Sequence, residues 1–275
     1  MEPETHGYEA AAILGALYGE GIAALPGAFP RSMVGELRED IDALFQEALR
    51  QPKGALPRGP HRYYVEIHPE RIRCFVQLVT HPWVQAVCEA VLGPDYKLVE
   101  IGFDVPEPGA QTQPWHRDFP APDATVKGRR LNSLAFNMTT VDVWEDMGPL
   151  EIAPGTQWDV SPSFEDGMFP PKSLYPRYQQ RAQRKLPKMG DISARSALTI
   201  HRGTANKSQK SRPTLVMGFD APDGRNAERH DLQLSARYVE TLSDDLRRHM
   251  AYRRVTEREP IVQAHTIQRL VDAGD

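Results

Sequence analysis

A histidine and an aspartate stand two positions apart in the segment Trp115–Phe119, as His116 and Asp118. On a β-strand, residues i and i+2 share a face, so these two side chains could reach one point in space. A second histidine, His201, ends the short apolar run Leu198–His201. Two imidazoles and one carboxylate, with open positions opposite them, form the facial ligand set of non-haem Fe(II) oxygenases. These three residues are therefore the candidate metal ligands.

Arg212 follows His201 by eleven residues, in the segment Ser211–Thr214. A guanidinium can form two parallel hydrogen bonds to one carboxylate. Arg212 could therefore hold the distal carboxylate of a 2-oxoglutarate co-substrate beside the candidate metal site. Two histidines and a carboxylate also occur in catalytic zinc sites, so zinc is an alternative metal. Hydrolysis at zinc has no need of such an arginine, which favours iron.

The composition is that of an ordinary soluble protein with a full hydrophobic core. The chain has 275 residues, 40% of them hydrophobic and 25% charged, and this length suits one elaborated β-domain. The formal net charge of -4 gives no electrostatic case for nucleic acid as the main partner. The two cysteines, Cys74 and Cys88, cannot form a disulfide framework and fit a reducing compartment, with packing as their expected role.

The sequence predicts neither a targeting segment nor a membrane span. Residues 1–5 are acidic and lack the basic and apolar regions of a signal peptide. No stretch approaches the roughly 18 uncharged apolar residues of a membrane span. The last three residues do not form a peroxisomal address. The cytoplasm is therefore the expected compartment, with no membrane partner.

Apolar spacing and capping residues predict helices on both sides of the β-rich region. Ser32 is a suitable N-cap for a segment whose apolar residues share one helical face. Pro82 at a first-turn position and Gly93 after the last apolar residue delimit another amphipathic segment. The expected helices span residues 8–18, 32–50, 82–92 and 235–253.

Short strands bounded by glycine and proline are predicted through the middle of the chain. Many such strands are typical of a β-sandwich or barrel. With helices before them, they predict a mainly β fold: a double-stranded β-helix, or jelly-roll barrel, buttressed by N-terminal helices. The candidate strands are residues 22–27, 97–104, 111–118, 131–140, 150–153, 191–194, 197–201 and 215–219.

One domain, residues 1–275, is expected. It would comprise a helical support (1–94), a jelly-roll core (95–220) with a lid insert (160–188), and a C-terminal helical closure (221–275). Loops on a rigid scaffold commonly carry specificity. The lid insert and a second candidate lid after the metal motif, residues 119–130, hold aromatic and basic side chains. They suit a small organic substrate, including an anionic one, although an ordinary solvated loop explains the same residues equally well.

Four segments together resemble the phytanoyl-CoA dioxygenase family of Fe(II)- and 2-oxoglutarate-dependent oxygenases. The resemblance extends over roughly residues 15–220. One difference is Gln157, where many family members carry a histidine that is not a metal ligand. The matching segments are Glu20–Phe29 before a long helix, Trp115–Asp118, Asp146–Thr156, and His201–Ser208 together with Arg212.

The resemblance implies an enzyme that binds Fe(II), 2-oxoglutarate and O2. It would convert 2-oxoglutarate into succinate and CO2 and would hydroxylate, or otherwise oxidise, an unactivated C–H bond of a small molecule. The residues carried over are the metal ligands His116, Asp118 and His201, and the co-substrate contacts Arg212, Thr214, Asn137 and Gln113.

Asp118 bears on the type of reaction. Halogenating relatives replace this acidic ligand with glycine or alanine to open a halide position, so hydroxylation is favoured here over halogenation. Three alternatives stay open: a non-catalytic jelly-roll binding protein, a zinc-dependent enzyme on the same fold, and a hydroxylase of protein or nucleic acid. A binding module has no need to keep three ligands and Arg212, which argues against the first.

Overall fold

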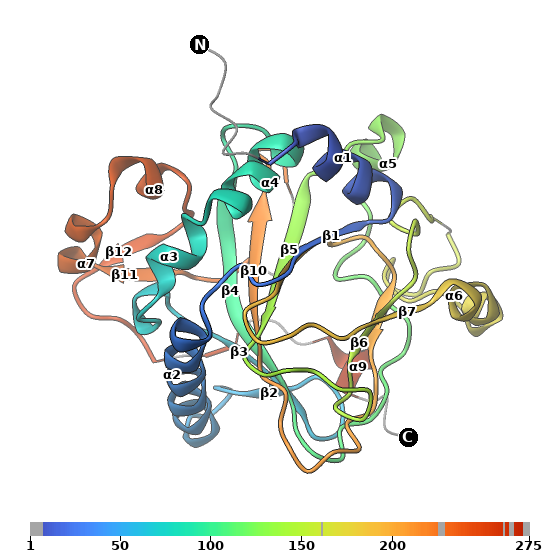
Figure 1. Cartoon of the computed structure of the whole chain (residues 1–275), viewed down its shortest axis with the longest axis horizontal. Helices are drawn as coiled ribbons and strands as arrows, with labels where there is room; N and C mark the ends of the chain where they lie inside the picture. The colour runs from blue at the N-terminus through green and yellow to red at the C-terminus, as the bar shows by residue number, and fades with distance from the viewer. Residues whose placement is uncertain (1–7, 161, 225–228, 261, 264–266, 272–275) are drawn as a thin grey trace.

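The computed structural model describes residues 8–160, 162–224, 229–260, 262–263 and 267–271. Its largest element is a seven-stranded antiparallel sheet, the major sheet, whose long strands run through the centre of Figure 1. In spatial order, its strands are β1 (Ile22–Leu25), β8 (Ile192–Ser196), β5 (Ser133–Thr139), β10 (Thr214–Asp220), β4 (Lys97–Pro106), β3 (Arg62–Glu66) and β2 (Leu56–Pro57).

A second antiparallel sheet, the minor sheet, faces the inner side of the major sheet. Its strands in spatial order are β7 (Gln183–Lys185), β6 (Leu150–Ile152) and β9 (His201–Gly203). Between β4 and β10 the chain crosses repeatedly from one sheet to the other. This alternation is that of a double-stranded β-helix, so the predicted fold class is confirmed.

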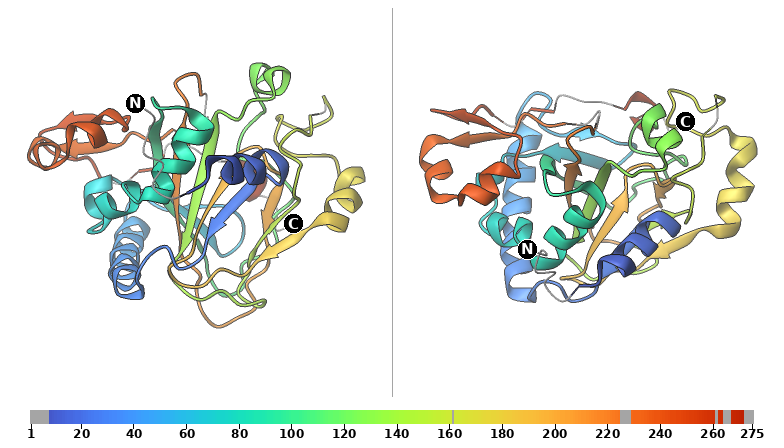
Figure 2. Two further views of the ribbon diagram at one scale, coloured as in Figure 1. Left: turned by 45° about the horizontal axis from the view of Figure 1, so that its top comes forward. Right: turned by 90° about the horizontal axis from the view of Figure 1, so that it is seen from above.

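Helices cover the outer side of the major sheet and both ends of the molecule. Figure 1 places α2, α3 and α4 on the side of β4 and β10 opposite β6 and β7. A parallel pair, β11 (Gln233–Ser235) and β12 (Arg253–Val255), lies with α7 and α8 at the end of the molecule opposite α6 (Figure 2). The α-helices are α1 (Ala10–Gly19), α2 (Arg31–Arg50), α3 (Phe75–Val79), α4 (Pro82–Leu92), α5 (Asp123–Gly128), α6 (Tyr175–Arg181), α7 (Ala236–Thr241), α8 (Asp244–Arg248) and α9 (Gln268–Val271), and Pro69–Arg71 and Lys172–Leu174 form 3₁₀ turns.

The main hydrophobic core lies between the major sheet and the helices. Strand alternation sends one set of side chains outward, where Phe103 of β4 meets Phe45 of α2 edge-on, with ring centroids 6.4 Å apart. Phe136 of β5 meets Trp83 of α4 in the same way at 6.0 Å. All four side chains are buried. Burial of large apolar side chains is the dominant stabilising term in folding.

The inner face of the major sheet is polar instead. Thr214 of β10 pairs with Asp104 of β4 on one side and with Thr139 of β5 on the other. Tyr64 of β3 pairs with Asp104 in turn. These residues and Arg195 of β8 line the space between the two sheets. Buried polar groups in such a position need hydrogen-bond partners or a function.

The predicted strand over residues 111–118 is wrong. Only His116 makes a β-bridge, an isolated antiparallel one with His201. Pro114 has no N–H to give to a ladder. Gln113 instead donates its backbone N–H to Gly203 O at 2.9 Å, so this segment follows β9 without forming a continuous strand.

The predicted strand over residues 197–201 is also wrong. β8 runs on to Ser196, and the backbone N–H of Thr199 then donates to Ser196 O at 3.0 Å, which closes a turn. β9 begins at His201. The candidate ligand therefore starts a strand where the sequence predicted that it would end one.

Two helical predictions also need correction. α2 begins at Arg31 with Pro30 as its N-cap, so Ser32 lies inside the first turn. The predicted closing helix over 235–253 is two short helices, because the hydroxyl of Ser243 accepts a hydrogen bond from Leu246 N at 3.1 Å and caps α8 separately. The strands β2 and β3 were not among the predicted strands.

Within the described part of the chain, no helix combines the length and the apolar character needed to cross a membrane. Residues 1–5 and the last three residues, on which the targeting predictions depend, lie outside the described residues.

Candidate active site

His116 and His201 are joined through their backbones. His116 N donates to His201 O at 2.9 Å, and His201 N donates to His116 O at 2.8 Å. This reciprocal pair places the two side chains next to each other, with ring centroids 4.4 Å apart. Residues 85 positions apart in the sequence are thus brought together by a single β-bridge.

Each imidazole is oriented by a carbonyl two residues earlier in its own segment. His116 Nδ1 donates to Pro114 O at 2.8 Å, and His201 Nδ1 donates to Thr199 O at 2.9 Å. The hydrogen bond at Nδ1 leaves Nε2 as the atom able to bind a metal. Burial holds the pKa of both imidazoles well below its usual value. Both rings are therefore neutral at physiological pH, as a metal ligand must be.

Asp118 reaches the same place from the loop that follows His116. Its backbone N–H donates to Ala197 O at 3.1 Å, which ties the loop to the turn after β8. Its carboxylate Oδ1 lies 3.4 Å from His201 Nε2, and Oδ2 lies 3.0 Å from Arg195 Nη2. No three metal-binding side chains in the described ranges already converge on one metal position. The three predicted ligands are adjacent, with the carboxylate shared between an imidazole and a guanidinium.

A cavity of about 470 Å³ lies between the major and minor sheets. This volume falls within the range of small-molecule sites. The three candidate ligands open onto it together with the predicted co-substrate residues. All seven predicted residues line this cavity: Gln113, His116, Asp118, Asn137, His201, Arg212 and Thr214.

Arg212 is buried in the cavity wall just before β10. Its Nη1 donates to Thr214 Oγ1 at 2.7 Å, and its Nη2 lies 3.8 Å from Asp104 Oδ2. Its Nε has no hydrogen-bond partner among the described residues. Burial lowers the pKa of Arg212 to about 10, so the side chain stays positive at neutral pH. A buried cation with spare donors is a suitable anchor for a carboxylate.

The sequence model of the phytanoyl-CoA dioxygenase (PhyH) family matches residues 17–214, about 72% of the chain. The chain belongs to the phytanoyl-CoA dioxygenase family. This family uses Fe(II), 2-oxoglutarate and O2, which confirms the predicted cofactor set at the level of the family. A search of curated proteins gives no significant match.

Solved structures share the fold at low sequence identity. The non-haem α-ketoglutarate-dependent carbocyclase SnoK, from nogalamycin biosynthesis, superposes with a TM-score of 0.63 at 18% identity, covering 80% of this chain and 86% of SnoK. The epimerase SnoN, solved with Fe3+, α-ketoglutarate and nogalamycin RO, gives 0.62 at 18%, covering 77% and 83%. EctD from S. alaskensis, solved with 2-oxoglutarate and 5-hydroxyectoine, gives 0.64 at 15%, covering 83% and 81%.

The donor set of the site fits the ions and co-substrate of the family. Two neutral imidazoles with free Nε2 atoms and one carboxylate suit Fe(II). Asn137 adds a buried Oδ1 with no hydrogen-bond partner in the described chain, beside Val216 on the next strand. Gln113 is different, because its Nε2 donates to Arg58 O at 2.9 Å and its Oε1 accepts from Gly203 N at 3.0 Å. Its amide braces two backbone segments, and its predicted contact with the co-substrate stays a prediction.

Phe169, in the predicted lid insert, stacks against His116 with ring centroids 5.9 Å apart and an angle of 29°. Arg269 of α9 lies over the ring of Phe169, with its guanidinium carbon 5.1 Å from the ring centroid. Arg269 also forms an ion pair with Glu165. Leu270 of the same helix lines the cavity. The lid insert and α9 therefore cover the histidine side of the site. No motif signals this contact in a single sequence.

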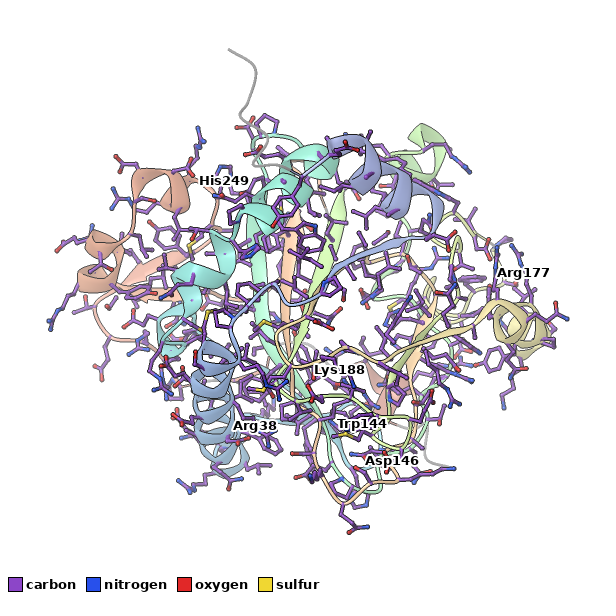
Figure 3. The ribbon with its side chains drawn as sticks, viewed as in Figure 1. Arg38, Trp144, Asp146, Arg177, Lys188 and His249 are labelled. Carbon is purple, nitrogen blue, oxygen red and sulfur yellow. The ribbon has the colours of Figure 1, made fainter. Side chains whose placement is uncertain are left out.

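Basic residues of the two predicted lids mostly face solvent. Lys127 pairs with Asp123 at 3.0 Å, and Arg130 pairs with Asp223 at 2.6 Å. Arg177 of α6 lies at the edge of the molecule, remote from Trp144 and Lys188 (Figure 3). An ordinary solvated loop accounts for these three residues, whereas Arg184 and Lys185 of the lid insert line the cavity.

Trp144 is 58% exposed, and the ammonium group of Lys188 lies 3.7 Å from the centroid of its ring (Figure 3). Its neighbour Val143 and the adjoining Leu186 line the cavity. Trp144 itself is therefore a surface residue next to the cavity wall.

Proposed function

We propose that this protein is an Fe(II)- and 2-oxoglutarate-dependent oxygenase that hydroxylates a small organic molecule. The observation that carries the proposal is the convergence of His116, His201, Asp118 and Arg212 on one cavity. His116 and Asp118 come from one loop, His201 begins β9, and Arg212 lies just before β10, so only the fold brings them together.

The four residues would have two roles, binding the metal and binding the co-substrate. His116 and His201 would hold Fe(II) through their Nε2 atoms, and Asp118 would add the carboxylate ligand that neutralises part of its charge. Arg212, oriented by Thr214, would bind the distal carboxylate of 2-oxoglutarate. Bound iron, 2-oxoglutarate and O2 supply the oxidant for an unactivated C–H bond. The cavity walls would then exclude water from the reaction.

The cavity walls suit a substrate with both an apolar and a polar part. The cavity lining combines apolar side chains with polar ones, and small-ligand sites use both kinds. The apolar set includes Ile22, Pro26, Val143, Leu150 and Leu186, and the polar set includes Tyr64, Glu100 and Arg195. Two buried free thiols, Cys74 and Cys88, fit the proposed reducing, cytoplasmic setting.

The test begins with metal-free protein under anaerobic conditions. Fe(II) is added, then 2-oxoglutarate, and the visible metal-to-ligand charge-transfer band is recorded. We expect a band in the wild type, a weak or absent band in Asp118→Ala, and a higher 2-oxoglutarate requirement in Arg212→Ala. Arg184→Gln is the matched control, because Arg184 also lines the cavity but pairs with Glu145 and Glu151.

The outcome decides between this proposal and its alternatives. A band that follows the expected order of variants supports the oxygenase, and succinate formation in air would then guide a substrate screen for hydroxylated product. Absence of the band in folded wild type, with zinc bound in preference to iron, contradicts the proposal in favour of a zinc enzyme. Absence of any metal binding favours a non-catalytic binding protein.

A further inference from the structure

Arg195 makes the closest side-chain contact to the carboxylate of Asp118. It lies on β8, opposite Ile22 of β1 and Ala135 of β5. Only 5% of Arg195 is exposed. Its Nη2 lies 3.0 Å from Asp118 Oδ2 and 3.3 Å from Oδ1, while its Nη1 donates to Ser196 O at 3.2 Å.

The Asp118 carboxylate therefore has two sides with different neighbours. Oδ1 lies 3.4 Å from His201 Nε2, on the side of the imidazoles. Arg195 Nη2 reaches both oxygens: it donates to Oδ1 at 3.3 Å and lies nearer to Oδ2, at 3.0 Å. A carboxylate free to rotate could offer both oxygens to a bound metal, whereas one held by an arginine offers a single oxygen on its open side.

We propose that Arg195 is a positioning residue that holds Asp118 so that one carboxylate oxygen faces the metal site. This inference rests on the proposed function, since it concerns the same three ligands. By holding the carboxylate through both oxygens, with Oδ2 the nearer, Arg195 restricts its rotation and would keep Oδ2 from taking a position that 2-oxoglutarate needs. Its role is therefore to protect co-substrate binding, rather than to increase the affinity for the metal.

The energetic cost of Arg195 supports a functional role. Its guanidinium is buried, and its Nε has no hydrogen-bond partner within the described residues. Burying an ion pair with incomplete hydrogen bonding commonly stabilises a fold less than apolar side chains of similar volume would. Unsatisfied buried donors of this kind call for an explanation such as a functional constraint. A contact whose only purpose was to join β8 to the Asp118 loop would not need a buried cation.

The test uses Co(II) as a spectroscopic probe of the metal site in Arg195→Gln. Glutamine keeps a polar side chain but cannot hold the carboxylate with a charged guanidinium. We expect Co(II) still to bind, because the freed carboxylate can offer it a second oxygen, and the visible Co(II) spectrum to change. The Kd of 2-oxoglutarate should rise about 10-fold or more, in line with the loss of a residue that orients a ligand.

Two further variants separate positioning from a purely structural role. Arg195→Lys keeps the charge but presents one compact ammonium group, so we expect a smaller rise in the Kd of 2-oxoglutarate. Arg184→Gln removes another cavity arginine that does not contact Asp118, and its Kd should equal that of the wild type. Circular dichroism and thermal melting establish that each variant is folded.

Each outcome has a definite meaning. If folded Arg195→Gln binds 2-oxoglutarate as tightly as the wild type, or loses Co(II), the inference is overturned while the proposed function stands. If Arg195→Gln does not fold, Arg195→Lys decides: a raised Kd supports the inference and an unchanged one overturns it. If the wild type itself binds neither Co(II) nor 2-oxoglutarate, the proposed function has failed.

Discussion

His116 and His201 reach their positions by the same local device. In each case Nδ1 donates to the carbonyl two residues earlier, at Pro114 and at Thr199. The side chain thus uses its own backbone as the group that selects the tautomer, with no second side chain needed. Once the β-bridge between the two segments forms, both candidate ligands, His116 and His201, are therefore already oriented with Nε2 available.

Arg62 is the residue that links the two sheets next to the proposed 2-oxoglutarate site. From β3 it donates to Asp104 Oδ2 at 2.9 Å and to Thr204 O, just after β9, at 3.1 Å. Asp104 in turn lies 3.8 Å from Arg212. Arg62 can cross the cavity only because Gly203 leaves room for it: a Cβ at position 203 would lie 2.5 Å from the guanidinium.

We predict that Gly203→Ala destabilises the protein by about 1–3 kcal/mol, because displaced Arg62 loses its buried contacts. Strand propensity alone would favour alanine over glycine, so the sign of the effect tests the steric argument. Urea denaturation of the metal-free protein measures it. The control is Gly35→Ala in α2, where a Cβ meets no atom within 4 Å and where alanine should stabilise the helix by about 0.5–1 kcal/mol. Equal effects of the two substitutions would contradict this role of Gly203.

The long amphipathic segments were predictable, and so were the short strands β1, β6 and β8, which overlap the predicted strands over residues 22–27, 150–153 and 191–194. α2, α4, β4, β5 and β10 lie close to their predicted positions because each buries a regular apolar face. Such periodicity is the strongest signal in a single sequence. β7 and β9 were not predicted, because each has three residues, too few for a pattern, and each exists through pairing with β6.

The candidate site residues could be proposed from the sequence because their types and order are distinctive, even though the local structure assigned to them was wrong. His116, Asp118 and His201 meet through one bridge and one turn rather than through two full strands. Arg195 and Phe169 carried no signal, because an arginine within a strand or a phenylalanine in a loop is common. Their contacts depend on the packing of segments distant in sequence.

Helix capping offers a test of the C-terminal elements. Ser243 Oγ accepts from Leu246 N at 3.1 Å and so caps α8, whereas Ser32 lies inside α2 and makes no cap. We predict that Ser243→Ala costs about 1 kcal/mol of stability, while Ser32→Ala changes stability by less than about 0.5 kcal/mol. Chemical denaturation of both variants gives the comparison. A larger loss in Ser32→Ala would restore the capping role that the sequence predicted for it.

Across the whole molecule, side-chain hydrogen bonds join the major sheet to the C-terminal unit formed by β11, β12, α7 and α8. His68, just after β3, accepts a hydrogen bond at Nδ1 from Gln233 N of β11 at 3.4 Å, and its Nε2 donates to Glu259 O at 3.2 Å. Both bonds can be made at once only by the neutral ring. Burial lowers the pKa of His68 below its usual value of 6.5, in agreement with this arrangement.

This arrangement predicts how stability depends on pH. Because the folded-state pKa of His68 lies below the unfolded value, the unfolded chain binds more protons in that range, and stability is lost as pH falls below 6.5. His81, His116 and His201 act in the same direction, since burial lowers their pKa values too. The metal-free protein should therefore be less stable at pH 5.5 than at pH 7.5. His68→Gln can make both hydrogen bonds without titrating, so it should lose less stability over this interval than the wild type. Urea denaturation at the two pH values measures the difference, and an unchanged loss in His68→Gln would show that protonation of His68 does not couple the C-terminal unit to the sheet.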